Sequence, residues 1–139
     1  MTGDTYVYMP DTTREELSEL WMAPYMNTYV AKVNSQIDGT YIMKPNFPGR
    51  GSHVANCSYM VHPSAQGKGI GKGMCKHSLQ EAKRLGFAAM QFNLVASTNL
   101  AAVHLWEKLG FSIVGTIPKA FHHQELGYVD AYIMYQSLT

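Results

Sequence analysis

The sequence has little of several features that define large classes of protein. It contains two cysteines, Cys57 and Cys75, too few for a disulfide framework and without the spacing of a metal site. Lys and Arg (11) nearly balance Asp and Glu (10), so the clustered basic charge of a nucleic-acid or membrane surface is missing. No apolar run approaches the length of a membrane span, and the polar N-terminus lacks the order of a signal peptide. We therefore expect a cytoplasmic protein without a metal, a nucleic-acid partner or a membrane partner.

The composition is that of an ordinary folded domain. Hydrophobic residues make up 46% of the 139 residues and charged residues 15%, which is enough apolar material for one core in a chain of this length. We find no internal repeat, low-complexity segment or linker in the sequence. Residues 1–139 are therefore predicted to form a single domain.

Hydrophobic periodicity, capping residues and turn signals divide the chain into strands and helices. The predicted strands are residues 6–9, 28–33, 39–43, 53–61, 88–95, 111–117 and 128–138, with a hairpin turn at 34–35. One predicted helix begins at the capping box of Thr12 and Glu15, and two more span 69–85 and 99–110. Segments 44–52 and 118–127 are predicted as connections. This order indicates an α/β (α+β) fold with helices packed against a mixed sheet.

The helix predicted at 69–85 has an apolar side that the sequence allows us to name. The side chains expected to face the core are Ile70, Met74, Cys75, Leu79, Ala82 and Leu85.

The segment SAQGKGIGKGM, residues 64–74, places four glycines two residues apart, between a predicted strand and a predicted helix. Free amide N–H groups at a helix start bind anions, and glycines let the backbone approach a phosphate closely. Lys68 and Lys72 add positive charge there. The pattern fits neither the Walker motif nor the dinucleotide motif Gly-x-Gly-x-x-Gly. Diphosphate binding is the sharper interpretation, and a flexible turn without a ligand is the alternative.

Two segments together resemble a known family. QGKGIG, residues 66–71, is similar to an Arg/Gln-x-x-Gly-x-Gly/Ala signature, and NLAAVHLWEKLGF, residues 99–111, is similar to Asn-x-x-Ala-x-x-Leu-Tyr-x-Lys-x-Gly-Phe. Both signatures occur, in this order and one strand apart, in the GCN5-related N-acetyltransferases (GNAT superfamily). The resemblance covers roughly residues 29–138.

This resemblance implies a single N-acetyltransferase domain with acetyl-coenzyme A (acetyl-CoA) as co-substrate and no metal. The family's fold is a mixed, mostly antiparallel twisted sheet, splayed at its central strands, with helices on both faces; here the N-terminus is shortened. In the family the glycine loop holds the pyrophosphate, and the strand before it binds the pantetheine arm through its backbone, with Val95 opposite. The implied coenzyme-binding residues are Met60, Val61, His62, Gln66, Gly67, Lys68, Gly69, Ile70, Gly71, Lys72, Asn99 and Trp106.

Trp106 stands where many family members have a tyrosine that protonates the leaving thiolate. Because an indole cannot serve as that acid, either another group protonates the sulfur or the thiolate leaves with little help. Asn99 is the implied catalytic residue near the sulfur, and a helix N-cap is its alternative role. The sequence does not decide which group is the general base. The candidates are a water chain that leads to bulk solvent and four histidines: His53, His62, His122 and His123.

A closer resemblance concerns the acceptor. The segments NCSYMV, FNLV, LWEKLGF and VGTIPKA are similar to the fungal acetyltransferases that detoxify proline analogues such as azetidine-2-carboxylate. In those enzymes asparagines matching Asn56 and Asn93 hold the substrate carboxylate, and the residue matching Tyr59, a phenylalanine there, shapes the ring pocket. The resemblance therefore implies a small-molecule amine substrate, such as an amino or imino acid.

Two other functions and one assembly are kept as hypotheses. The chain could be a non-catalytic acyl-CoA-binding sensor, or a protein or peptide N-acetyltransferase that needs an open groove. The short apolar segment TYVYM, residues 5–9, could pair with a second chain as an edge strand. We therefore predict a homodimer.

Overall fold

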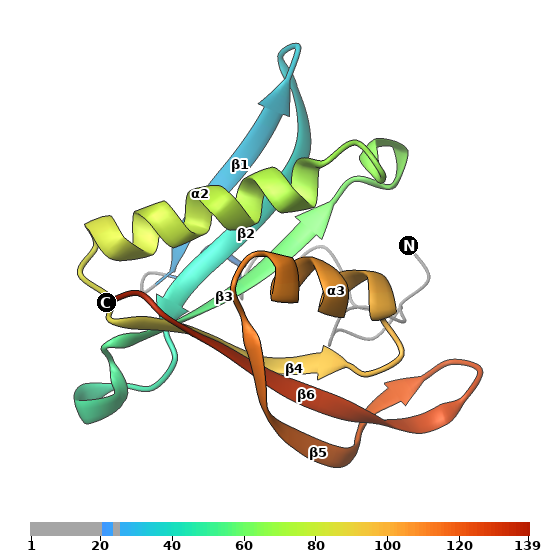
Figure 1. Ribbon diagram of the computed structural model, residues 1–139. Coiled ribbons are helices and arrows are strands. Elements are labelled where there is room, and N and C mark those ends of the chain that lie inside the picture. The colour runs from blue at the N-terminus through green and yellow to red at the C-terminus, as the bar shows by residue number, and fades with distance from the viewer. Residues whose placement is uncertain (1–20, 24–25) are drawn as a thin grey trace.

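One six-stranded sheet organises the protein, as the computed structural model of residues 21–23 and 26–139 shows (Figure 1). The strands are β1 (Asn27–Val33), β2 (Gln36–Pro45), β3 (Val54–Val61), β4 (Ala89–Ala96), β5 (Ser112–His123) and β6 (Gly127–Ser137). Their order across the sheet is β1-β2-β3-β4-β6-β5, and every neighbouring pair is antiparallel except β3 and β4, which run parallel. The helices are α2 (Ile70–Arg84) and α3 (Leu100–Lys108), with short 3-10 helices η1 (Gly49–Gly51) and η2 (Pro63–Ala65).

The predicted element order is confirmed over this part of the chain. Asn34 and Ser35 form the β1–β2 turn with φ angles of 51° and 68°, the left-handed conformations that two-residue hairpin turns require. The strand predicted at 6–9, and with it the proposed dimer edge, lies outside the described residues. The same holds for most of the helix predicted from Thr12; of that segment the structure describes Trp21, which is helical.

The two segments predicted as connections, 44–52 and 118–127, are shorter in the structure than predicted. β2 continues through Lys44 and Pro45, which pair with Asn56 and Ala55 of β3. β5 continues through Pro118 to His123, with an irregularity in its pairing to β6 between Ile117 and Phe121. Pro118 is compatible with a strand here because β5 is at the edge of the sheet, where a missing N–H leaves no partner unpaired.

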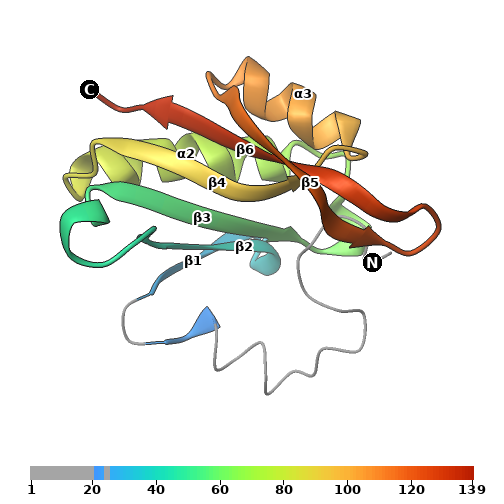
Figure 2. The same ribbon diagram turned by 90° about the horizontal axis from the view of Figure 1, so that it is seen from below.

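The helices α2 and α3 pack against the same face of the sheet (Figure 2). Tyr59 of β3 shows this directly, because its hydroxyl contacts Ser78 of α2 and its ring packs against Trp106 of α3. The family resemblance implied helices on both faces; the helix predicted from Thr12 falls largely outside the described residues. The core between the helices and the sheet includes Tyr41, Met43, Ala55, Met74, Cys75, Met90, Phe92 and Met134.

The buried side of α2 differs from the prediction at two positions. Leu85 is 40% exposed, because the helix ends at Arg84 and Leu85 is its C-cap. Ser78, which the prediction did not include, is fully buried on the inner side of the helix. Its hydroxyl donates to the Cys75 carbonyl at 2.7 Å and lies 2.6 Å from the Tyr59 hydroxyl, so that a polar group is satisfied inside the core.

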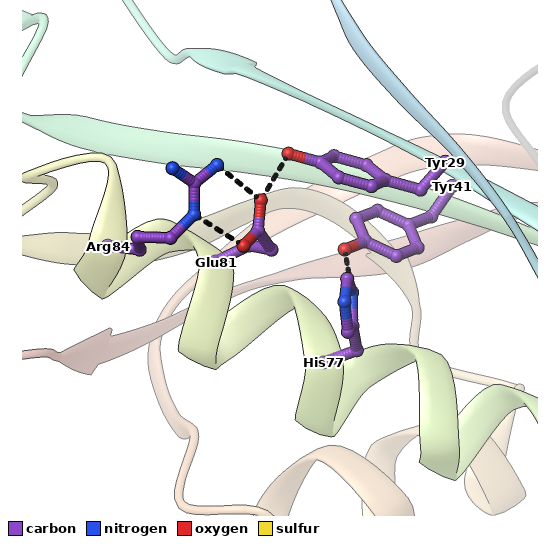
Figure 3. Close-up of polar contacts among 5 residues, drawn as sticks. All are labelled: Tyr29, Tyr41, His77, Glu81 and Arg84. Carbon is purple, nitrogen blue, oxygen red and sulfur yellow. Dashed lines mark hydrogen bonds and ion pairs between the residues drawn. The ribbon is translucent and has the colours of Figure 1, made fainter.

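A polar and aromatic cluster attaches the β1–β2 hairpin to α2 (Figure 3). The Tyr29 hydroxyl donates to Glu81 Oε2 at 2.8 Å, and Arg84 donates to both Glu81 oxygens at 2.7 and 2.9 Å. The Tyr41 hydroxyl lies 2.6 Å from His77 Nδ1. The rings of Tyr29 and Tyr41 stack with their centroids 4.6 Å apart. These contacts attach the hairpin to α2. They thereby hold β2 in place beside the cavity described next.

Candidate active site

The central strands β3 and β4 separate after a short paired segment. They pair at Val54–Ala89, Ala55–Met90 and Asn56–Gln91, and then diverge, although both strands continue (Figure 1). A cavity of about 500 Å³ opens at this point. It is lined by both strands, by Ile42 and Lys44 of β2, by Gly71 of α2 and by one side of α3. The splayed sheet that the family resemblance implied is therefore present.

Backbone direction in β3 decides which groups point into the gap. The His62 N–H donates to the Asp38 carbonyl at 2.7 Å, and the Asn46 N–H donates to Val54 at 2.8 Å. Because such pairs recur every second residue in an antiparallel ladder, the backbone of Met60 and His62 faces β2. The backbone groups of Tyr59 and Val61 point toward the gap instead. Of Met60, Val61 and His62, which the resemblance implied as the residues that bind the pantetheine arm through the backbone, only Val61 has its backbone groups toward the gap, and those of Tyr59 face it as well.

The glycine loop ends beside the cavity, where α2 begins. Gly67 and Gly69 have φ angles of 81° and 79°, a conformation that glycine adopts without strain. The helical hydrogen bonds start with the Gly73 N–H donating to the Gly69 carbonyl at 3.0 Å. The amides of the preceding helical positions, residues 70–72, are therefore unused by the helix. Lys68, Lys72 and Gln66 are exposed around them.

Asn99 lies on the cavity and also caps α3. Its side-chain oxygen accepts a hydrogen bond from the Ala102 N–H at 3.3 Å, so the N-cap role is confirmed. Its position on the cavity wall leaves the proposed role near the sulfur in place.

Trp106 lines the same cavity and packs against the aromatic core. Its ring centroid lies 5.3 Å from Tyr59 and 5.0 Å from Phe92. Tyr59 points to the helix-covered face, and burial raises the pKa of its hydroxyl well above the usual value. Burial also raises the pKa of the neighbouring Cys57 thiol to about 12. Both groups therefore stay neutral at physiological pH.

Side-chain amides form a connected group at the splay. Asn56 donates to the Gln91 carbonyl at 3.0 Å, and so satisfies the backbone at the last paired position. Gln91 donates to the Asn93 side-chain oxygen at 3.0 Å, and Asn93 donates to the side-chain oxygen of Asn46 at 2.7 Å. Asn56 and Asn93 both line the cavity, as does Tyr59. Tyr59 contacts the helices, whereas Asn56 and Asn93 alternate with the core residues of their strands, so these side chains lie on different faces of the sheet.

The residues of this site that sequence reasoning missed include the polar side chains of Lys44, Asn46 and Gln91. Lys44 and Asn46 fall in the segment predicted as a loop. The alternation of Ile42, Lys44 and Asn46 continues the period of the strand before them, and it could have placed Lys44 on the same face as Ile42.

The four histidines proposed as bases do not line the cavity. His62 Nδ1 contacts the Ser64 hydroxyl at 2.7 Å, and His123 Nδ1 accepts from the N–H groups of residues 125 and 126 at 3.1 Å. His122 packs on Tyr128 with centroids 4.8 Å apart, and His53 is exposed before β3. Three of these side chains therefore serve local turns and packing. No cluster of potential metal ligands was found among residues 21–23 and 26–139, and within the same ranges no helix is long and apolar enough to span a membrane.

Comparison with known proteins identifies the family. Residues 3–111 match the acetyltransferase (GNAT) family. The chain belongs to this family. It is 41% identical over 119 residues to the N-acetyltransferase aca1 of Schizosaccharomyces pombe, a match that covers 84% of this chain and 56% of aca1. It is 34% identical over 67 residues to the L-amino acid N-acyltransferase MnaT of Escherichia coli, covering 48% of this chain and 38% of MnaT.

A solved structure supports the GNAT fold over nearly the whole chain. A GCN5-related N-acetyltransferase from Kribbella flavida superposes with a TM-score of 0.90 at 43% identity, covering 98% of this chain and 83% of that one. The chain spans little more than half the length of aca1. The fold and the family are thus shown, and the two sequence signatures that suggested them were read correctly.

Proposed function

We propose that the protein is an acetyl-CoA-dependent N-acetyltransferase that acetylates the amine of a small amino or imino acid. The observation that carries this proposal is the splay between β3 and β4, which joins an anion-binding loop to a pocket with polar amides. The family and the relatives aca1 and MnaT support the same reaction class.

The coenzyme side is formed by α2 and β3. The unused amides of residues 70–72 and the charges of Lys68 and Lys72 would hold the diphosphate. The backbone groups of Tyr59 and Val61 that face the gap would bind the pantetheine arm as an added strand does. When bound, acetyl-CoA supplies the activated acetyl group.

The acceptor side is the pocket with Asn56 and Asn93. The protein's contribution to the reaction is to bring the neutral amine to the acetyl carbon and to donate hydrogen bonds to the acetyl oxygen, for which the Tyr59 N–H is the proposed donor. The lining residues in the described part of the chain include no carboxylate or imidazole. The amine therefore has to arrive unprotonated. As the new C–N bond forms and the C–S bond breaks, the proton that the nitrogen loses passes through water, and water protonates the thiolate that leaves.

The experiment is free-thiol release from acetyl-CoA with a panel of proline analogues, amino acids, polyamines and short peptides. Release with azetidine-2-carboxylate or an amino acid, lost in Asn93→Ala while acetyl-CoA binding is kept, supports the proposal. Tight acetyl-CoA binding with no release from any amine favours the sensor, and release only with peptides favours the peptide acetyltransferase.

A further inference from the structure

Lys44 is the one cationic side chain among the described residues that line the cavity. It lies on β2, directly opposite Asn56 of β3 in the ladder. Its strand neighbours Tyr41 and Met43 belong to the core under the helices. Lys44 and Ile42 therefore face the other side of the sheet, where they line the cavity beside Asn56.

Among the described residues that line the cavity, Lys44 has no counter-ion. The described lining residues include no Asp or Glu, and Cys57 and Tyr59 are kept neutral by burial. The ion pair found within the described ranges, Arg84–Glu81, belongs to α2 on the helix-covered face. Lys44 is partly buried, and a cation that loses water without gaining a partner is unfavourable, so an anionic group on the bound acceptor would be stabilised at this position.

The neighbouring amides offer further donors for the same anion. Asn56 uses one N–H on the Gln91 carbonyl and keeps the other. Asn93 likewise uses one N–H on Asn46 and keeps the other. An ammonium group and two amide N–H groups suit a carboxylate, which accepts several hydrogen bonds. The same charge repels polyamines and other multiply cationic acceptors.

We infer that Lys44 selects acceptors that carry a carboxylate close to the reacting amine. This inference rests on the proposed function and narrows it, because it names the side chain that distinguishes an amino acid from an uncharged or polycationic amine of similar size. Lys44 acts on the affinity for the acceptor and takes no part in proton transfer.

The test compares azetidine-2-carboxylate with its carboxamide in the wild type, in Lys44→Met and in Lys44→Arg. Lys44→Met should lower kcat/KM for the carboxylate by about ten- to a hundredfold, mainly through KM, because a charge-assisted hydrogen bond is lost. In Lys44→Met, kcat/KM for the carboxamide should change less than about twofold. Lys44→Arg should retain most of the wild-type preference for the carboxylate over the carboxamide. Comparing each acceptor across variants cancels the different basicities of the two amines.

Two controls separate the possible failures. Lys32→Met removes an exposed lysine of β1 that is not on the cavity. It should leave kcat/KM for both acceptors unchanged. The dissociation constant of the N-acetylated carboxylate product gives a readout independent of turnover and should rise in Lys44→Met. An equal loss with both acceptors, no loss with either, or weaker acetyl-CoA binding in Lys44→Met would overturn the inference while the proposed function stands. A wild type that acetylates no amine would overturn both.

Discussion

The side-chain amide of Asn93 donates a 2.7 Å hydrogen bond to Asn46, which lies 47 positions earlier in the chain. Asn93 is on β4 and Asn46 directly follows β2, so this contact spans β3, the strand between them. The Asn93 oxygen is occupied as well, because Gln91 donates to it at 3.0 Å. Both ends of the Asn93 amide are thus held, and its remaining N–H is oriented before any acceptor binds.

Asn46→Ala should therefore weaken acceptor binding without touching the acceptor itself. Loss of one neutral hydrogen bond is expected to raise the acceptor KM about three- to tenfold, with kcat and the acetyl-CoA dissociation constant unchanged. Steady-state kinetics with the best acceptor of the panel checks this. Asn27→Ala, at an exposed position of β1 that is not among the cavity-lining residues, is the matched control, and an equal effect in both variants would show that Asn46 does not orient Asn93.

Two glycines of the segment 64–74 differ in whether their backbone conformation requires glycine. Gly69 has a φ of 79°, and Gly73 lies inside α2 with no atom near the position of an added Cβ. Gly69→Ala should raise the acetyl-CoA dissociation constant about five- to thirtyfold, since an L-residue pays about 1–2 kcal/mol for this conformation and an exposed loop will relax away from it. Calorimetric titration of the coenzyme measures the change.

Gly73→Ala is the control for the loop. Its N–H is already bonded to the Gly69 carbonyl, so coenzyme affinity should stay the same. The free energy of unfolding should rise by about 0.5–1 kcal/mol, because alanine is the better helix former. Equal loss of affinity in both variants would mean that the glycines matter as a group and not through the φ angle of Gly69.

Local signals in the sequence predicted the parts of the fold that depend on neighbours in the chain. The Asn34–Ser35 turn and the start of α2 after the glycine loop are such cases, because the conformation of one or two residues decides them. The face of β3 on which Tyr59 lies and the direction of its backbone depend on the register with β2, which no local signal contains. The contact between Asn46 and Asn93 depends on the order of three strands. Family resemblance supplied the splay, and residue-level geometry had to come from the structure.

We predict that Trp106 contributes packing and not a proton. Its ring packs against both Tyr59 and Phe92, which also contact each other, in the aromatic core. Trp106→Ala should lower the free energy of unfolding by about 3 kcal/mol or more through the cavity it leaves. Trp106→Phe should keep kcat within about tenfold, whereas removal of a general acid costs at least about a hundredfold. Chemical denaturation and single-turnover kinetics distinguish the two, and a hundredfold loss in the phenylalanine variant would give the indole N–H a catalytic role.

The contact between Tyr29, Glu81 and Arg84 predicts how stability depends on acid. Hydrogen bonds from Arg84 and Tyr29 lower the pKa of Glu81 to about 2, compared with about 4.3 in an unfolded chain. Because the folded-state pKa is the lower one, the carboxylate stabilises the fold above about pH 4.3, and this contribution is lost as the pH falls toward 2. The difference in Tm between the wild type and Glu81→Gln should be constant near neutral pH, shrink below about pH 4.3 and vanish near pH 2. Arg84→Met should move this decline to higher pH, since it removes the main cause of the shift, and parallel Tm curves for the wild type and Glu81→Gln at all pH values would contradict the assignment.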